Sequence, residues 1–341
     1  MELPGLSAMA AVELEDALRK VIAERDLPLY RMMGFQLGWV DEKGETVSRP
    51  PPDRAHGALA LASAQAVNGD FRPAIGYAVA VELVQNFSQI HVDVEDGNTE
   101  RAGRPSIWWT WGPAQAINAG DGMHAMARLA LYDLRHDGAA PDRVAAALKA
   151  LDEATLRLCE GEYLDIAYQE RLALSVNDYL AMAEARMGAL FGCAARLGAM
   201  AGPHGKPEAA DRLAEFGSKL GTARQVAGDI AAFWGEDERD QVEQGRLIDK
   251  KKSLPVVHAM ATADPTTRRR LGDLYVQRVL DPASIKTVAG MLEASGSRRF
   301  TQDTLVRLLA EADSAVASAG LEKKGAELLR AAARQIAGEA G

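Results

Sequence analysis

The fold is decided by residues 82–121, which read ELVQNFSQIHVDVEDGNTERAGRPSIWWTWGPAQAINAGD. Apolar and aromatic residues recur at intervals of three and four from Val81 to His91. This period predicts one long helix. Asp93 and Asp96 fall at the end of that helix, one turn apart, so their carboxylates lie on the same face.

These acids and the arginines after them predict a diphosphate site. Two carboxylates one turn apart can share a hard divalent cation such as Mg²⁺, which prefers oxygen ligands. Arg101 and Arg104 follow in a loop broken by glycine and proline, where guanidinium groups can bind an anion. On spacing alone, Asp93 and Asp96 could equally be a solvated helix end. With the arginines, they predict a metal-assisted site in which Asp93, Asp96 and Arg101 are catalytic.

Three segments of the stretch follow a known pattern. Residues 91–96 read HVDVED, residues 101–106 read RAGRPS, and residues 116–121 read AINAGD. They resemble the trans-isoprenyl diphosphate synthases, or polyprenyl synthetase family, whose pattern is HDDIxDxxxxRRGxPT followed by AINxGD. The resemblance implies an all-α fold, an isoprenoid synthase-type single-domain helical bundle around a central cavity. Two positions depart from the pattern: Val92 replaces the first aspartate, and Ala102 replaces an arginine.

A second segment, FGSKLGTARQVAGDIAAFWGE at 216–236, is similar to the family's second metal motif, FGxxLGxAFQxxDDxxD/G. Gln225 is in register, and the resemblance makes it a substrate-binding residue. Gly228 and Asp229 stand where two aspartates are expected, so the resemblance implies Asp229 as a catalytic residue and a third metal ligand facing Asp93. Without that register Asp229 would be an ordinary surface acid.

Further cations are implied for the diphosphate. The segment KKKSLP at 250–255 resembles the family's KKKTLP, in which the first lysines help to hold a diphosphate, and this assigns Lys250 and Lys251. Arg186 takes the place of a lysine that contacts the allylic diphosphate. A lysine run is otherwise usually solvated.

Aromatic residues are candidates for a hydrocarbon pocket. Phe87 lies five residues before Val92, where the resemblance implies a bulky side chain that shortens the cavity. Four tryptophans could line the same pocket or, more commonly, pack in the core: Trp108, Trp109, Trp111 and Trp234.

The site for a second diphosphate, that of isopentenyl diphosphate, is expected to be weakened. In the family it uses a GGKRxRP loop, and the aligned residues here are PDRAHG at 52–57. Asp53 replaces the lysine and His56 replaces an arginine, which leaves Arg54 and Gln85. An acid about 4 Å from a diphosphate costs on the order of 4 kcal/mol per unit charge at an effective dielectric near ~20. Ordinary condensation with isopentenyl diphosphate should therefore be poor.

Three functions remain open on these residues. The first is a terpene-synthase-like lyase that uses Mg²⁺ to ionise one allylic prenyl diphosphate and release diphosphate. The second is a non-catalytic partner subunit, or pseudoenzyme, of an active prenyl diphosphate synthase. The third is an atypical prenyltransferase with a non-isopentenyl acceptor. The resemblance implies a homodimer, and the second function a heterodimer.

Composition sets the remaining expectations. The chain has 341 residues and is 48% hydrophobic, which is enough for one large domain over 1–341. Within this domain we expect N-terminal helices and a loop at 1–53, a motif-bearing core at 54–262 and C-terminal helices at 263–341. A net charge of −9 argues against nucleic-acid binding. The N-terminal segment lacks a basic region, and no run reaches the ~18 apolar residues of a membrane span, which predicts a cytoplasmic protein.

Apolar periodicity and Gly/Pro breaks predict helices throughout and no sustained strand. Residues 30–39 continue the apolar pattern of the first helix. The helices are expected at 8–26, 54–67, 73–96, 112–136, 141–159, 162–173, 175–201, 207–234, 253–262, 265–278, 282–294 and 301–338.

Overall fold

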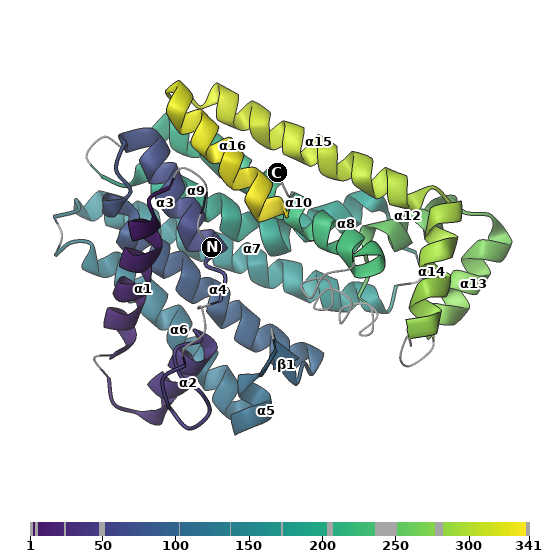
Figure 1. Cartoon of the computed structure of the whole chain (residues 1–341), viewed down its shortest axis with the longest axis horizontal. Helices are drawn as coiled ribbons and strands as arrows, with labels where there is room; N and C mark the ends of the chain where they lie inside the picture. The colour runs from purple at the N-terminus through teal and green to yellow at the C-terminus, as the bar shows by residue number, and fades with distance from the viewer. Residues whose placement is uncertain are drawn as a thin grey trace.

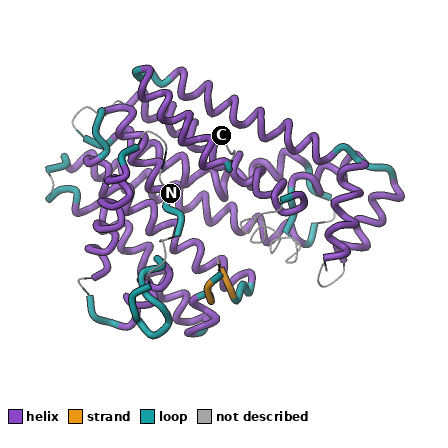
Figure 2. The backbone as a smooth tube through the Cα atoms, in the orientation of Figure 1, coloured by secondary structure: helices purple, strands orange, loops and turns teal. Residues whose placement is uncertain are grey.

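A computed structural model describes residues 3, 6–23, 25–47, 52–101, 103–136, 138–171, 173–202, 207–235, 251–276 and 282–338. This part of the chain is almost entirely helical, which confirms the all-α prediction (Figures 1 and 2). The α-helices are α1 (Ala8–Ala23), α2 (Pro28–Gln36), α3 (Ala55–Asn68), α4 (Ile75–Asp96), α5 (Ile107–Trp111), α6 (Pro113–Asp133), α7 (Pro141–Gln169), α8 (Val176–Ala183), α9 (Ala189–Met200), α10 (Pro207–Trp234), α12 (Leu254–Thr262), α13 (Pro265–Val276), α14 (Pro282–Ala294), α15 (Ser297–Ser318) and α16 (Lys323–Ala337). A 3-10 turn, η1 (Arg72–Ala74), precedes α4, and a π-helical turn, η2 (Glu184–Gly188), joins α8 to α9.

Helix α4 lies in the core, where it packs against α3, α6 and α9. Most of its first half is apolar and buried, as expected for a helix surrounded by others, with Ile75, Gly76 and Gln85 half-buried and Glu82 a buried acid. Gly97 ends the helix in the left-handed conformation, with φ +69°, and its N–H donates to the carbonyl of Asp93. The cap therefore fixes both aspartates of the first motif at the C-terminal end of α4.

Helices α9 and α10 pack closely because glycines line their contact. A Cβ at Gly217 would lie 2.7 Å from the carbonyl carbon of Phe191, and one at Gly221 would lie 2.9 Å from Cα of Gly188. These are the glycines of the FGxxLG pattern. Their small size sets the distance between α10 and the η2–α9 segment.

Helix α7 is a single helix, so the predicted break between 159 and 162 is wrong. Gly161 is not a breaker here but a point of close approach. A Cβ at this position would lie 2.6 Å from Cα of Arg186 in η2. The glycine lets α7 contact the backbone of the π-helical turn.

Replacing Gly161 with alanine should therefore lower the free energy of unfolding by about 1–3 kcal/mol, because the added methyl group meets backbone. Gly290 in α14 is the matched control, since a Cβ there would meet nothing within 4 Å. Gly290→Ala should raise stability by up to about 1 kcal/mol through helix propensity. Urea denaturation measures both, and equal effects of the two variants would contradict the close approach.

Two further boundaries differ from the sequence prediction. The predicted helix over 301–338 is two helices, α15 and α16, separated at Gly320, which has φ +64°. The predicted 112–136 helix is preceded by a separate short helix, α5, and Gly112 lies between them with φ +87°. Both breaks contain a glycine with a positive φ, which an L-residue rarely adopts.

A two-residue hairpin interrupts the helical fold. Strand β1 (Glu100–Arg101) pairs with β2 (Arg104–Pro105), and Gly103 in the turn has φ +69°. The hairpin follows α4 directly and brings Arg101 back to the helix end.

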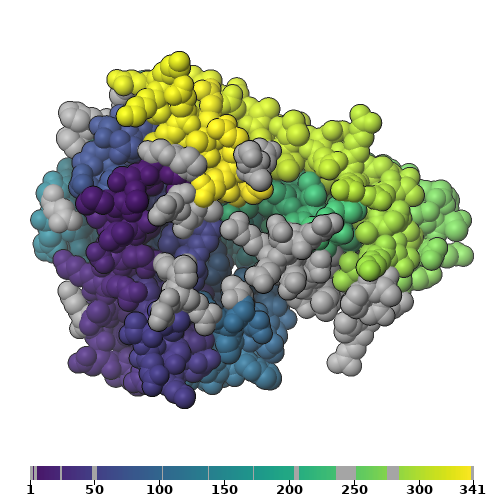
Figure 3. Space-filling view, viewed as in Figure 1, coloured from purple at the N-terminus to yellow at the C-terminus, as the bar shows by residue number. Residues whose placement is uncertain are grey.

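The C-terminal helices extend the bundle. Helix α15 runs along one edge of the molecule, from the α13–α14 pair at one end to α16, and it packs on α10 (Figure 1). Figure 3 shows α16 and α1 on the same face of the molecule.

No helix among the described residues is long and apolar enough to cross a membrane. The division into a single domain over 1–341 stays a prediction.

Candidate functional site

The first acidic motif is held by the hairpin. Asp93 is buried, and Arg101 binds its carboxylate with Nη2–Oδ1 at 2.6 Å and Nε–Oδ1 at 2.9 Å. Burial raises the pKa of Asp93 above its usual value, and the Arg101 charge opposes this rise. Two of the residues predicted as catalytic, Asp93 and Arg101, are thus a bidentate pair at the end of α4.

Asp96 pairs with a lysine of the later motif. The ammonium of Lys251 lies 2.6 Å from Oδ2 of Asp96 and 3.0 Å from Oδ2 of Asp165 on α7. The side chains of Lys251 and Asp165 are almost completely buried, at 3% and 0% exposed. One protein cation therefore lies between carboxylates from two helices.

Arg186 continues the network from η2. Its Nε lies 2.8 Å from Glu162 Oε2 and 3.5 Å from Asp165 Oδ2, and its Nη1 donates to Oε1 of Gln225 at 2.7 Å. The side chain is 9% exposed. The structure thus places the predicted Arg186 and Gln225 in direct contact.

Asp229 is buried on α10, one turn after Gln225. Gln225 Nε2 donates to its Oδ1 at 3.2 Å, the Leu254 N–H donates to its Oδ2 at 2.7 Å, and the Tyr179 hydroxyl donates to the same Oδ2. Donors from α8, α10 and the start of α12 therefore fix this carboxylate.

These contacts form one buried polar network. It runs from Asp96 through Lys251, Asp165, Arg186 and Gln225 to Asp229. The two metal motifs are thus joined within one site, and the site combines carboxylates with cations able to bind a diphosphate. Lys250 and Ala102 lie outside the described residues.

The donor chemistry fits magnesium, because the acids supply hard carboxylate oxygens. Asp96 and Asp165 already hold a positive group between them, although that group is an ammonium. Over the described part of the chain, no three acidic, histidine or cysteine side chains converge as a metal-holding group. The assignment of Asp93, Asp96 and Asp229 as metal ligands stays a prediction.

Sequence reasoning missed three members of the network: Glu162, Asp165 and Tyr179. Glu162 and Asp165 have the same one-turn spacing as Asp93 and Asp96, which was the available signal. The misplaced helix break before them obscured it. Tyr179 is a lone tyrosine on α8, and no local pattern distinguishes it.

Phe87 lies between α4 and α6. Its ring centroid is 4.8 Å from that of His91 and 5.2 Å from that of His124. Gln85 is half-buried on α4. Their predicted roles at the substrate stay predictions.

Of the tryptophans, Trp111 packs edge-on against Phe35 with centroids 5.0 Å apart, whereas Trp109 is 62% exposed.

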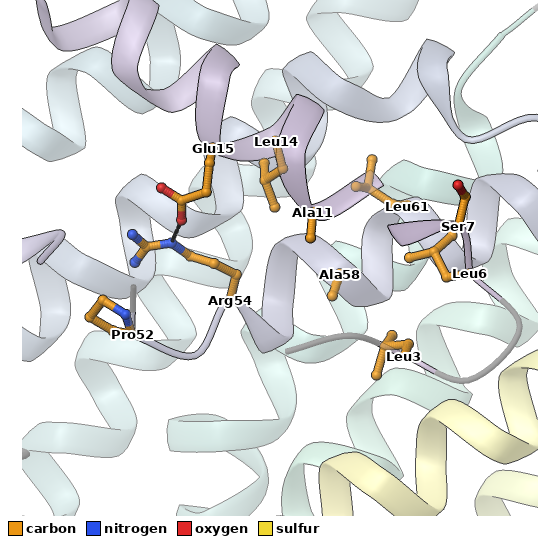
Figure 4. Close-up of a pocket in the computed structure, with 10 residues that line it drawn as sticks. All are labelled: Leu3, Leu6, Ser7, Ala11, Leu14, Glu15, Pro52, Arg54, Ala58 and Leu61. Atoms are coloured by element: carbon orange, nitrogen blue, oxygen red, sulfur yellow. Dashed lines mark hydrogen bonds and ion pairs between the residues drawn. The ribbon is translucent and has the colours of Figure 1, made fainter. Parts of the chain in front are cut away.

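In the loop that precedes α3, the Arg54 guanidinium forms an ion pair with a protein carboxylate. Arg54 is buried, its Nε lies 2.7 Å from Glu15 Oε1, and its Nη2 donates to the Leu37 carbonyl. Figure 4 shows Arg54 directed at Glu15 of α1, beside a small pocket between α1 and α3. Asp53 lies 3.4 Å from Arg224 of α10. Arg54 therefore stabilises the packing of the loop on α1.

His56 and Glu82 are buried beneath the same loop. The His56 ring packs on Phe191 at 3.9 Å, and burial, with the nearby Arg224 charge, lowers the pKa of His56 to about 3. Glu82 accepts the Gly57 N–H at 2.7 Å, and burial raises the pKa of Glu82 to about 7. His56 is thus neutral at pH 7 and supplies no positive charge.

The raised pKa of Glu82 makes stability depend on pH. Its ordinary value is 4.5, so the folded protein holds a proton between pH 4.5 and about 7 that the unfolded chain releases. Stability from this group is present below pH 4.5 and is lost as the pH rises through 7. The Glu82→Gln side chain does not titrate, so this variant does not lose stability in the same way. The unfolding free energy of Glu82→Gln minus that of the wild type should therefore increase by about 3 kcal/mol from pH 4.5 to 8.

Urea denaturation of both proteins across this range measures the difference. Glu153→Gln, at a 66% exposed side chain, is the control and should show no such trend. A constant difference between Glu82→Gln and the wild type would contradict the raised pKa.

The sequence of this chain is similar to those of known proteins that share its motifs. Residues 39–292 match the family model of the polyprenyl synthetases. The chain belongs to the polyprenyl synthetase family. It is 32% identical over 324 residues to the (2E,6E)-farnesyl diphosphate synthase of Mycobacterium tuberculosis H37Rv, covering 94% of this chain and 88% of that protein. It is 30% identical over 299 residues to the geranylgeranyl diphosphate synthase of the same organism, covering 87% and 84%.

Solved structures of this family share the fold. The polyprenyl synthetase from Streptomyces coelicolor A3(2) superposes with a TM-score of 0.89 at 29% identity, over 98% of this chain and 99% of that one. The geranylgeranyl pyrophosphate synthetase from Pyrococcus horikoshii gives a TM-score of 0.83 at 26% identity, over 96% and 95%. The resemblance inferred from the motifs is confirmed, including the isoprenoid synthase-type architecture.

Proposed function

We propose that this polyprenyl synthetase family member binds an allylic prenyl diphosphate and cleaves its carbon–oxygen bond to release diphosphate. The buried network that joins both aspartate motifs to Lys251 and Arg186 is the observation that carries the proposal. The farnesyl and geranylgeranyl diphosphate synthases among its relatives support the same substrate class.

In this proposal the cationic side chains bind the diphosphate and the carboxylates bind the metal. Arg101, Arg186, Lys250 and Lys251 would bind the diphosphate oxygens, and Gln225 would orient Arg186 and Asp229. Magnesium held by Asp93, Asp96 and Asp229 would supply the charge that stabilises the departing diphosphate. Phe87 would limit the length of the hydrocarbon chain.

Within this activity we favour a lyase that acts on the allylic diphosphate alone. The support comes from the loop before α3, where Arg54 is engaged by Glu15, Asp53 by Arg224, and His56 is neutral. Such a loop offers little positive charge to a second diphosphate. Without an isopentenyl acceptor, the carbocation would cyclise, lose a proton or meet water.

A second candidate is a prenyltransferase that joins the allylic unit to an acceptor. The identity with two prenyl diphosphate synthases over most of the chain favours it. Retention of Gln85 favours a residual acceptor site.

Purified protein is incubated with geranyl, farnesyl or geranylgeranyl diphosphate and Mg²⁺, each with and without isopentenyl diphosphate. Release of diphosphate with a cyclic or volatile hydrocarbon, independent of isopentenyl diphosphate, is expected. Longer prenyl diphosphates formed only with isopentenyl diphosphate would establish the transferase instead. Absence of any product, together with co-purification of a complete synthase, would contradict catalysis and support the partner-subunit role.

We also propose that the protein is a cytoplasmic homodimer, paired through α6 and α7. Large apolar side chains are exposed on both helices, namely Ile117, Leu129 and Tyr132 on α6 and Leu156, Tyr163 and Ile166 on α7. Exposed large apolar residues on two helices in contact are typical of interfaces, and a two-fold axis would bury the same surface on each copy.

Tyr163 is the most exposed of these side chains, at 70%. Tyr163→Glu should convert the dimer to a monomer, because a charge would be buried at the interface. Val306→Glu on α15, also at an exposed apolar side chain (64%), is the control. Light scattering after size exclusion gives the mass; a monomeric wild type, or a Tyr163→Glu variant that remains dimeric, would contradict the assignment.

A further inference from the structure

Helix α13 lies at one end of the molecule, where it packs on α12 and α14 (Figure 1). Its inner side holds Leu271, which is fully buried. The three residues before this leucine are arginines, Arg268, Arg269 and Arg270, and all three are exposed. Because successive residues of an α-helix point about 100° apart, these side chains spread over the solvent side of α13.

The positive charge of these arginines is not neutralised by contact with acids. None of the three forms an ion pair with an acid in the described part of the chain. The acids nearest in sequence are Asp264 and Asp273. Asp264 accepts the backbone N–H groups of Thr266 and Thr267 where the helix begins, and Asp273 is exposed. The outer surface of α13 therefore carries an excess of positive charge.

The neighbouring helices keep this end of the molecule positive. Lys286 on α14 is exposed and forms no ion pair among the described residues. On α15, Arg298 and Arg299 lie 2.6 and 3.8 Å from acidic oxygens. Residues 264–276 and 282–303 together hold six basic and four acidic side chains, the acids being Asp264, Asp273, Glu293 and Asp303. Because the whole chain has a net charge of −9, this positive charge is local to the α13 end.

A local excess of arginine fits an anionic surface. Clusters of lysine and arginine bind membranes that contain anionic lipids, and each such side chain near the membrane adds affinity. A lipid surface also suits the proposed substrate, because an allylic prenyl diphosphate has an apolar chain that partitions into a bilayer. Nucleic acid fits less well, since the protein as a whole is acidic.

We propose that Arg268, Arg269 and Arg270 dock the protein on an anionic lipid surface, with α13 against the headgroups. The choice of a lipid partner rests on the proposed function, whose substrate is an amphiphile. The contact is electrostatic and reversible, because the three side chains are charged and exposed. The acidic remainder of the chain is repelled by the same surface, so the protein meets the membrane by its α13 end.

Co-sedimentation with lipid vesicles tests the proposal. The wild type should bind vesicles of phosphatidylglycerol and phosphatidylcholine in about 0.1 M NaCl, should not bind vesicles of phosphatidylcholine alone, and should be released in about 0.5 M NaCl. The triple variant Arg268→Glu, Arg269→Glu, Arg270→Glu should bind the anionic vesicles at least about tenfold more weakly, since three attractive charges become repulsive.

The matched control changes the net charge by the same amount on other surfaces. It combines Lys20→Glu, Lys43→Glu and Lys324→Glu, at exposed lysines that form no ion pair among the described residues. Because these positions lie on other elements, the control should stay within about threefold of the wild type.

Equal losses in the two triple variants would assign binding to net charge and overturn the proposal, as would a wild type that binds both kinds of vesicle equally or neither. Binding to a DNA duplex but not to anionic vesicles would also overturn it. If thermal unfolding shows that the arginine variant is not folded, Arg269→Glu alone should still weaken binding by about threefold. No prenyl substrate is present, so an inactive enzyme would leave this test intact, and a failure here would leave the catalytic proposal standing.

Discussion

Replacing Asp93 with alanine is expected to reduce the consumption of allylic diphosphate by about a hundredfold or more, the range seen when one preorganised charge-stabilising group is removed. Asp93 is one of the proposed magnesium ligands, and it fixes Arg101 through a bidentate pair. Its loss would weaken the proposed metal binding and release the Arg101 guanidinium, which we propose contacts the diphosphate. Steady-state release of inorganic diphosphate measures the effect.

Asp121→Ala is the control, because Asp121 is 67% exposed and contacts only the edge of His91 at 3.7 Å among its described ion pairs. It should retain the wild-type rate. Arg101 is 29% exposed, so its side chain can reach solvent in Asp93→Ala and the variant should remain folded. A full rate in folded Asp93→Ala would remove Asp93 from the metal site.

Asp165→Ala is expected to cause the largest loss of stability, about 3–5 kcal/mol, because removing one partner of a buried ion pair leaves uncompensated charge. Asp165 is 0% exposed and contacts both Lys251 and Arg186. Among the described ion pairs, its removal leaves Lys251 with Asp96 and Arg186 with Glu162. Chemical denaturation at pH 7 measures the change.

Asp152→Ala is the matched control. Asp152 pairs with Arg128 at 2.9 Å between α7 and α6, but both side chains are more than a third exposed. Such a surface pair contributes about 0–1 kcal/mol. If Asp165→Ala is no less stable than Asp152→Ala, the buried network does not hold α4, α7 and η2 together.

The fold could be predicted from the sequence because its helices have clear apolar periods and recognisable ends. The 207–234 helix and the 282–294 helix were predicted with the bounds that α10 and α14 have. Two of the errors came from glycine. Gly161 was taken for a break although it serves close packing, and Gly320 was passed over although it separates two helices.

The site could be predicted in part. Spacing identified Asp93, Asp96 and Arg101, and the resemblance to the family added Arg186, Gln225, Asp229 and Lys251. Contacts in the structure join most of these residues. The pairings could not be predicted, because whether Lys251 binds Asp96 or solvent depends on how α7 packs against α4. For the same reason Glu162, Asp165 and Tyr179 were missed, since each acts through a partner distant in sequence.

The central claim is that each chain holds one diphosphate, bound by the network around Lys251 and Arg186. Calorimetric titration with inorganic pyrophosphate in saturating Mg²⁺ tests it directly. We predict one pyrophosphate bound per chain, with the same stoichiometry in Asp53→Ala and no detectable binding in Arg186→Ala. Two pyrophosphates per chain in the wild type, or unchanged binding in Arg186→Ala, would contradict the account.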